Sequence, residues 1–193
     1  MPKAVFFDRD GVLNKALIRN GQPHSPEHLE EFEFSCGAAE ALCSLKRAGF
    51  LLIVATNQPN VARRLQQQSD VEIIHEKLKS SLPLDDVRIC YHDDYHHCSC
   101  RKPEPGLLLS AARDWEVRLS DSYMIGDRWK DMEAGRRAGC KTIFLEHSYN
   151  GNEPRIADYY ANSILEAAKW ILVQGNSSLA AGTDVRSHYG PKI

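Results

Sequence analysis

Short apolar runs recur along the chain, at residues 5–7, 50–55, 87–91, 122–126 and 141–145. Runs of this kind, without strict alternation of apolar and polar positions, are typical of strands that are buried on both faces of a parallel sheet. The third run gives the weakest signal. We therefore predict five buried strands.

Apolar residues recur at helical spacing between these runs. In the first such segment, Ala38, Ala41, Leu42 and Leu45 share one face, and Gly49 ends the pattern. By the same criterion, helices are predicted at residues 37–48, 69–82, 107–115, 131–138 and 164–173. Strands that alternate with helices predict an α/β fold with an open, Rossmann-like parallel sheet flanked by helices.

Two segments lie outside this alternation. Residues 15–33 form a long polar connection rich in turn-forming residues, and connections of this length are more often functional than idle. Large apolar side chains are few over residues 175–193, where we expect a weakly ordered tail. The remaining residues, 1–174, are predicted to form one domain.

The overall composition is ordinary for a globular protein, with 42% apolar and 26% charged residues. A net charge of −2 provides no basic field that would attract nucleic acid. No apolar run approaches the ~20 residues needed to span a membrane, and the first strand follows Met1 too closely to leave room for a signal peptide. We expect a cytoplasmic protein, monomeric or weakly oligomeric, that binds neither nucleic acid nor membranes.

Residues suited to phosphate chemistry follow the predicted strands or precede a helix. They are Asp8, Asp10, Thr56, Asn57, Lys102 and Asp127. Ligands of open parallel sheets bind outside the carboxyl ends of the strands, so these side chains are expected to line one crevice. Two acids as close as Asp8 and Asp10 repel each other unless a cation lies between them. Mg²⁺ is the expected cation, because it binds through carboxylates and substrate phosphate oxygens.

Cysteine and histidine cluster in the stretch after the third strand. The candidate metal ligands are Cys90, His92, Cys98 and Cys100. A Cys₃His set is a closed tetrahedral combination typical of structural zinc, although the spacing here is tighter than in a zinc finger. His96 and His97 compete for the fourth position. We expect a structural Zn²⁺ ion that fixes the loop carrying Arg101 and Lys102.

Four motifs resemble, in order, those of the haloacid dehalogenase superfamily of aspartate-dependent phosphatases. They are residues 8–14, 55–58, 101–103 and the GDxxxD pattern at 126–131. The Cys/His stretch further resembles the branch that holds heptose bisphosphate phosphatases and histidinol-phosphate phosphatases. Members of that branch are small, lack a large cap domain and carry a zinc loop beside the active site. The resemblance implies the same fold here.

The resemblance also implies roles for the acids. Asp8 would be the nucleophile that forms an aspartyl-phosphate. Asp10 would protonate the leaving alcohol and then act as a base on the hydrolytic water. Asp8, the backbone carbonyl of Asp10 and Asp127 would bind Mg²⁺. Asp131 would support the site by orienting Lys102 or a metal-bound water.

Substrate contacts are implied for Thr56, Asn57, Arg101 and Lys102. Thr56 and Lys102 would hold the phosphoryl oxygens. The second motif departs from the family pattern Asn-Gln-Ser-Gly-Ile-Ala-Arg-Gly, since it reads Asn-Gln-Pro-Asn-Val-Ala-Arg-Arg over residues 57–64. Arg63 and Arg64 are therefore either contacts to a second phosphate or ordinary solvated arginines.

The predicted activity is Mg²⁺-dependent hydrolysis of a small sugar phosphate, with D-glycero-D-manno-heptose 1,7-bisphosphate losing its 7-phosphate. Histidinol-phosphate phosphatase is the alternative that keeps the same chemistry. A polynucleotide 3′-phosphatase is disfavoured by the acidic net charge. A zinc-stabilised binding module without activity would be expected to lack at least one of the key acids or Lys102, and none is lost.

Overall fold

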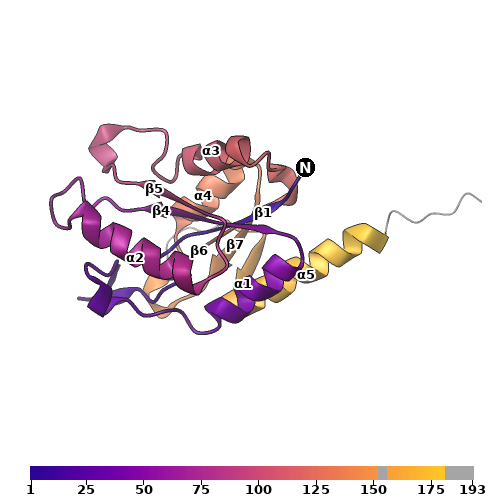
Figure 1. Ribbon diagram of the computed structural model, residues 1–193, viewed down its shortest axis with the longest axis horizontal. Coiled ribbons are helices and arrows are strands. Elements are labelled where there is room, and N and C mark those ends of the chain that lie inside the picture. Colours follow the sequence, from indigo (N-terminus) through magenta and orange to yellow (C-terminus); the bar gives the residue numbers. More distant parts are fainter. Residues whose placement is uncertain (152–155, 181–193) are drawn as a thin grey trace, which may run out of the picture.

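Six parallel strands form one sheet in a computed structural model that describes residues 1–151 and 156–180 (Figure 1). The strands are β1 (Ala4–Phe7), β4 (Leu51–Asn57), β5 (Asp86–Cys90), β6 (Tyr123–Gly126), β7 (Lys141–Leu145) and β8 (Tyr159–Ala161). Five of them lie where the apolar runs predict strands. Strand β8 was not predicted, because this edge strand has three residues, of which only Ala161 is buried.

The strand order, β5-β4-β1-β6-β7-β8, puts β1 in the middle of the sheet. Phe7 pairs with Val54 of β4 on one side and with Ile125 of β6 on the other. All four residues of β1 are buried, as its apolar run predicts. The chain continues to opposite sides of β1, so the carboxyl end of this strand is the switch point at which open sheets bind ligands.

Five α-helices cover the sheet. They are α1 (Ala38–Arg47), α2 (Gln68–Ser81), α3 (Gly106–Asp114), α4 (Trp129–Ala138) and α5 (Ile164–Ala180). Val5 and Phe7 pack in the core shared with α1, α2 and α5, whereas Ala4 and Phe6 face α3 and α4 (Figure 1). The alternation along β1 thus divides the interior into two cores. The predicted open parallel sheet flanked by helices is confirmed.

Helix α5 is longer than predicted, because it continues from the expected end at Val173 to Ala180. A single Gly costs a helix only about 1 kcal/mol relative to Ala, so Gly175 does not stop it. Residues 181–193 of the expected tail lie outside the described part of the chain. The tail and the domain boundary at residue 174 stay predictions. Within the described ranges, no helix is both long and apolar enough to cross a membrane.

The polar connection over residues 15–33 contains a hairpin that was not predicted. Strands β2 (Leu17–Arg19) and β3 (Gln22–His24) pair antiparallel, and the short 3₁₀ helix η1 (Leu29–Glu31) follows. Asn20 and Gly21 turn the hairpin with positive φ angles of 52° and 73°. An Asn-Gly pair is a strong hairpin signal, so the sequence did contain the information. Three further 3₁₀ helices are η2 (Asp94–His96), η3 (Leu119–Asp121) and η4 (Ser148–Asn150).

Candidate active site

A cavity of about 300 Å³ opens at the carboxyl ends of β1, β4 and β6. Most of the predicted site residues line it, namely Asp8, Asp10, Asn57, Arg101, Lys102, Asp127 and Asp131. These side chains come from the ends of three strands, from the loop before α3 and, for Asp131, from the first turn of α4 (Trp129–Ala138). The structure therefore brings together residues that are far apart in the sequence, at the edge of the sheet where the strand rule expects a ligand.

Three carboxylates and one ammonium group form the floor of this cavity. Asp8, Asp127 and Asp131 each offer an oxygen within 4.8 Å of the others. The Lys102 Nζ atom lies 2.9 Å from Asp8 Oδ1 and 2.5 Å from Asp131 Oδ1. Burial lowers the pKa of Lys102, but the carboxylates of Asp131 and Asp8 outweigh it and raise the pKa. Lys102 is therefore a fixed positive charge.

The same crowding disfavours ionisation of the acids. Burial and the nearby carboxylates of Asp131 and Asp10 raise the pKa of Asp8 to about 6, against the opposing effect of Lys102. Burial, Asp131 and Asp8 also raise the pKa of Asp127. Raised pKa values are typical of carboxylates that are clustered to bind a cation. A divalent cation between them would favour the ionised carboxylates and lower both pKa values.

One atom in particular supports a cation at this site. Among the described residues, Asp127 Oδ1 is buried without a hydrogen-bond partner, whereas Oδ2 accepts a hydrogen bond from Tyr149. Both oxygens of Asp131 are already engaged, by Lys102 Nζ and by the backbone N–H of Arg128. The donor set fits Mg²⁺, with Asp8 and Asp127 as the available carboxylates, whereas Asp131 is placed to orient Lys102.

Two glycines allow the motifs to approach one another. Gly11 has a φ of +82°, and a Cβ atom there would lie 2.5 Å from Asp127 Oδ2. A Cβ atom on Gly126 would lie 2.2 Å from the Cβ atom of Asp131. The Gly residues of the first and fourth motifs are therefore needed for the close packing of the acids.

Asp10 is held differently from the other acids, because its carboxylate accepts hydrogen bonds from several sides. Its donors are Arg9 Nε and Nη2, Asn14 Nδ2, Ser25 Oγ and Gln58 Nε2, at 2.8 to 3.1 Å. Burial raises the pKa of Asp10, but the Arg9 guanidinium and the other donors outweigh it and lower the pKa. Whether the backbone carbonyl of Asp10 binds a metal stays a prediction.

The two residues of the second motif are not equally available to a substrate. Thr56 is fully buried, its hydroxyl accepts a hydrogen bond from Gln58 Nε2 at 2.9 Å, and it does not line the cavity. Asn57 lines the cavity, and its amide exchanges two hydrogen bonds with the backbone of Lys102, at 3.0 and 3.1 Å. Asn57 thus fixes the position of the lysine, and direct contact of either residue with a substrate stays a prediction.

Two of the three candidate arginines, Arg63 and Arg101, already have carboxylate partners. Arg63 makes two hydrogen bonds of 2.6 Å to Asp93, and neither Arg63 nor Arg64 lines the cavity. Arg101 lines it but lies 2.7 Å from Asp94. The carboxylate partners offset the charges of these arginines. The cavity therefore has less unpaired positive charge than the number of arginines in the sequence indicates.

Other cavity residues were not singled out from the sequence. Arg128, Trp129 and Lys130 line the cavity at the start of α4, opposite the hairpin residues Pro23 and His24. They occupy the variable positions of the GDxxxD motif, which is why the motif alone did not point to them.

A turn after β7 packs directly on the acids. The Tyr149 hydroxyl donates to Asp127 Oδ2 at 2.9 Å, and Asn150 Nδ2 donates to the Asp127 carbonyl at 2.8 Å. His147 Nε2 lies 2.8 Å from the carbonyl oxygen of Gly11. These three residues were not predicted from the sequence. The strand rule used for β1, β4 and β6 would have found them, because they follow the carboxyl end of β7.

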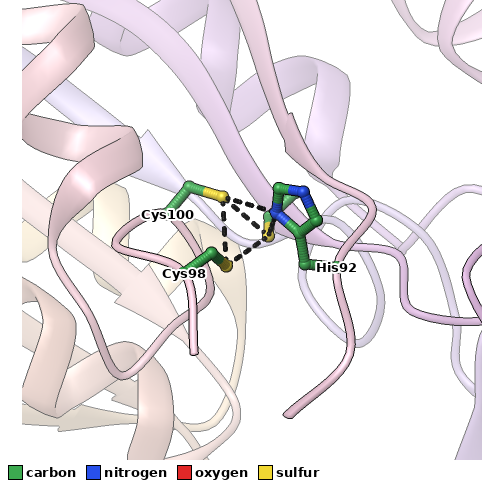
Figure 2. A group of neighbouring side chains, drawn as sticks. His92, Cys98 and Cys100 are labelled. Atoms are coloured by element: carbon green, nitrogen blue, oxygen red, sulfur yellow. Dashed lines mark hydrogen bonds between the residues drawn. The ribbon is translucent and has the colours of Figure 1, made fainter. Parts of the chain in front are cut away.

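The four predicted zinc ligands also come together. Cys90, His92, Cys98 and Cys100 each offer a ligand atom within 4.8 Å of the others (Figure 2). His92 Nδ1 lies 3.3 Å from Cys100 Sγ, and the sulfur of Cys98 lies 3.4 Å from that of Cys100 and 3.7 Å from that of Cys90. A tetrahedron with bonds of about 2.3 Å to sulfur has edges of about 3.8 Å. The sulfurs of Cys90 and Cys100 lie only 2.9 Å apart, so the group is somewhat more compact than a metal site of this kind.

The competing histidines are placed elsewhere. His96 Nδ1 accepts a hydrogen bond from the backbone N–H of Asp93, at 3.0 Å, which closes the start of η2. His97 ends η2 with a positive φ of 47° and is not in the ligand group. The geometry therefore favours His92 as the fourth candidate ligand.

Comparison with known proteins agrees with this geometry. Residues 99–167 match the family model described as HAD-hydrolase-like. The chain is 35% identical over 185 residues to the D-glycero-beta-D-manno-heptose-1,7-bisphosphate 7-phosphatase of Pasteurella multocida (strain Pm70), covering 89% of this chain and 97% of the relative. It is 33% identical to the protein of the same name from Escherichia coli (strain K12), with 89% and 94% covered.

Solved structures show the same relationship. The crystal structure of D,D-heptose 1.7-bisphosphate phosphatase from B. bronchiseptica, complexed with magnesium and phosphate, matches with a TM-score of 0.76 and 26% identity. The match covers 89% of this chain and 99% of that one. The haloacid dehalogenase-like fold expected from the four motifs is confirmed.

Proposed function

The chain belongs to the HAD-like hydrolases, in the family of the D-glycero-beta-D-manno-heptose-1,7-bisphosphate 7-phosphatases, and from that premise we propose its reaction. It is a Mg²⁺-dependent phosphomonoesterase that removes the 7-phosphate of a heptose 1,7-bisphosphate through an aspartyl-phosphate. The observation that carries this proposal is the placement of Asp8 beside Lys102 and Asp127 on the floor of one cavity.

Asp8 is the nucleophile in this proposal. One of its carboxylate oxygens attacks phosphorus, and the bond between phosphorus and the sugar oxygen breaks. Lys102, held by Asp131 and Asn57, stabilises the negative charge on the phosphoryl oxygens. Mg²⁺, bound by Asp8, Asp127 and the backbone carbonyl of Asp10, would offset the repulsion between carboxylate and phosphate.

Asp10 is the general acid and base. It donates its proton to the sugar oxygen as the alcohol leaves, and it takes a proton from the water that attacks the aspartyl-phosphate. That attack releases inorganic phosphate and restores the Asp8 carboxylate. Arg9 and the other donors lower the pKa of Asp10 in the free protein, against the effect of burial. A bound phosphate dianion raises it again, because a neighbouring negative charge disfavours the carboxylate.

A second phosphate on the substrate fits the charge of the cavity wall. Arg128 Nε lies 3.4 Å from Asp127, and Lys130 Nζ lies 3.7 Å from Asp94, so both cations are held more loosely than Arg63 or Arg101. Their side chains are 38% and 33% exposed. Trp129 lies between them in the sequence and offers a flat apolar face to a sugar ring. Such a wall favours a bisphosphate over histidinol phosphate, whose far end carries an amine.

The Cys/His group is proposed to hold one structural Zn²⁺ ion. Four protein ligands leave no open position for water, so the ion would stabilise the loop without taking part in the chemistry. Arg101 and Lys102 directly follow Cys100, so a fixed loop also fixes the lysine of the active site. We further propose that the enzyme acts in the cytoplasm as a monomer or weak oligomer.

Side-by-side kinetics test the proposed substrate. Purified protein with Mg²⁺ is assayed for phosphate release from heptose 1,7-bisphosphate and from histidinol phosphate. We expect a higher kcat/KM for the heptose bisphosphate and no turnover of either by Asp8→Asn. A higher value for histidinol phosphate would assign the chain the other substrate, and activity of Asp8→Asn within tenfold of wild type would refute the mechanism.

A further inference from the structure

Arg9, between the two acids of the first motif, has no solvent-exposed surface and does not line the cavity. A buried arginine is rare unless its charge and its donors are matched, because removing an ion from water is unfavourable. Among the described residues, its one ion-pair partner is Asp10. The Arg9 side chain therefore pairs with the carboxylate of Asp10 from the side of the core.

The contact between the two residues has a fixed geometry. Arg9 Nε lies 3.1 Å from Asp10 Oδ1, and Nη2 lies 3.0 Å from Oδ2, which is the two-pronged arrangement of an arginine on a carboxylate. Nη2 also donates to Gln58 Oε1 at 3.1 Å, while Gln58 Nε2 donates to Asp10 Oδ2 at 3.0 Å. The plane of the guanidinium thus sets the plane of the carboxylate.

The third nitrogen of the guanidinium, Nη1, contacts a residue of a helix that is distant in the sequence. His75, on α2, places Nε2 3.2 Å from Arg9 Nη1, although the two residues are 66 positions apart in the sequence. Arginine has no acceptor, so His75 must accept with Nε2 and carry its proton on Nδ1. Burial and the Arg9 guanidinium lower the pKa of His75 to about 3, which keeps the ring neutral and able to accept.

This arrangement is not the one that stability alone would select. His75 is 4% exposed, and its Nδ1 atom is buried with no hydrogen-bond partner in the part of the chain that the structure describes. A buried donor without an acceptor destabilises a fold, and apolar side chains at both positions 9 and 75 would leave no such donor. Buried polar groups that break a packing rule are expected where function requires them.

We propose that His75 and Arg9 are positioning residues that orient Asp10 for proton transfer to the leaving alcohol. This inference rests on the proposed phosphatase reaction. His75 fixes Nη1, the fixed guanidinium presents Nε and Nη2 to Asp10, and Asp10 keeps its carboxyl group directed at the sugar oxygen. Without the His75 acceptor, the guanidinium rotates to satisfy Nη1, and the carboxyl group turns with it.

Two substrates with different leaving groups test this role. An alkyl phosphate needs a proton on its leaving oxygen, whereas 2,4-dinitrophenyl phosphate expels a stable anion that needs none. The measured quantity is kcat/KM for each substrate, which reports the transfer of the phosphoryl group to Asp8 and not the later hydrolysis. The ratio of the two values does not depend on the folded fraction of a preparation, so an unstable variant remains informative.

Three variants and a control separate positioning from packing. His75→Leu removes the acceptor, and Arg9→Lys keeps the charge but loses the two-pronged contact. For both, we expect kcat/KM to fall by about 10²-fold on the alkyl phosphate and by less than about threefold on dinitrophenyl phosphate. His75→Gln, whose amide oxygen can accept from Nη1, should restore the ratio to within about threefold of wild type. Val71→Ala, a buried position on the same helix, is the matched control and should leave the ratio unchanged.

The outcomes are distinct. Equal losses on both substrates in His75→Leu, an unchanged ratio in Arg9→Lys, or no rescue by His75→Gln would overturn the positioning role. Heptose 1,7-bisphosphate serves as the alkyl phosphate, and glycerol phosphate replaces it if the proposed substrate is wrong. The proposed phosphatase reaction itself would be refuted if the wild-type protein hydrolyses none of the three substrates, heptose 1,7-bisphosphate, glycerol phosphate and dinitrophenyl phosphate.

Discussion

The Tyr149 hydroxyl donates a hydrogen bond to Asp127 Oδ2 at 2.9 Å, from the turn that follows β7. Asp127 Oδ1 is buried and has no hydrogen-bond partner among the described residues, and the carboxylate lies within 4.8 Å of those of Asp8 and Asp131. Partners of this kind orient metal ligands, and their loss commonly weakens metal binding 10–100-fold, as an order of magnitude. Tyr149 therefore links the fifth predicted strand to the candidate magnesium site.

We expect Tyr149→Phe to raise the Mg²⁺ concentration for half-maximal activity by about tenfold, with a kcat at saturating Mg²⁺ close to that of wild type. A titration of phosphate release against Mg²⁺ measures both values. Tyr95→Phe is the control, because Tyr95 is 64% exposed and is not among the residues that line the cavity. An unchanged Mg²⁺ dependence in Tyr149→Phe would show that the hydroxyl does not orient Asp127.

The main elements of the fold were predictable because each has a local cause. The apolar run before Asp8 predicts a buried strand, and the position of an acid at its end predicts where a ligand binds. The hairpin over residues 17–24 was predictable from Asn20-Gly21 but was overlooked. The four metal-binding candidates, at the end of β5 and in the loop after it, were found because their ligand types cluster in the sequence itself.

The long-range polar contacts were not predictable, since each joins positions distant in the chain. Arg63 has a partner, Asp93, 30 positions away, so its charge could not be known to be matched. His75 looks like any polar residue of an amphipathic helix until α2 packs beside Arg9. Local periodicity carries no information about such pairs, because tertiary packing alone decides which polar groups meet.

Asp8→Asn should abolish turnover while the fold stays intact, because the change removes the attacking oxygen at nearly the same side-chain volume. Asp10→Asn should also be severely impaired, since the leaving alcohol loses its acid, but it should still bind Mg²⁺ through the backbone carbonyl. Phosphate release and Mg²⁺ titration by calorimetry measure the two effects. Loss of Mg²⁺ binding in Asp10→Asn would instead make its carboxylate a ligand.

Lys130→Ala should raise the KM for heptose 1,7-bisphosphate by about tenfold, because a second phosphate loses a cationic partner. The KM for a monophosphate such as p-nitrophenyl phosphate should change by less than about twofold, as its far end is neutral. Arg63→Ala is the matched control, because Arg63 is bound to Asp93 and does not line the cavity. An equal loss of affinity in both variants would contradict a role for Lys130 at the second phosphate.

Protein purified without chelator should carry about one zinc ion per chain, in the four-ligand set of a structural site. Cys98→Ser should lower the melting temperature and reduce activity, because metal binding stabilises the loop that carries Lys102. Elemental analysis and thermal unfolding check both results. Cys43→Ser, an exposed cysteine outside the group, should change neither. Protein without zinc would refute the site.

The neutral state of His75 should make the fold sensitive to acid. Its pKa is lowered from 6.5 to about 3 in the folded protein, so between these values the unfolded chain binds more protons. The free energy of unfolding therefore falls as the pH drops below 6.5, and this contribution is fully present only above that pH. At pH 5, about 1.5 pH units below the ordinary pKa, the loss is about 2 kcal/mol.

His75→Gln removes this titration but keeps an acceptor for Arg9, so its stability should fall less on acidification. The raised pKa values of Asp8 and Asp127 act in the opposite direction, because those acids gain protons more readily when folded. They are shared by both proteins and cancel in the comparison. Urea unfolding at about pH 7 and about pH 5 measures how much free energy of unfolding each protein loses on acidification. This loss should be about 2 kcal/mol smaller in His75→Gln than in wild type. Stability curves that stay parallel over this range would show that His75 titrates normally in the fold, and that the imidazole beside Arg9 is not held neutral.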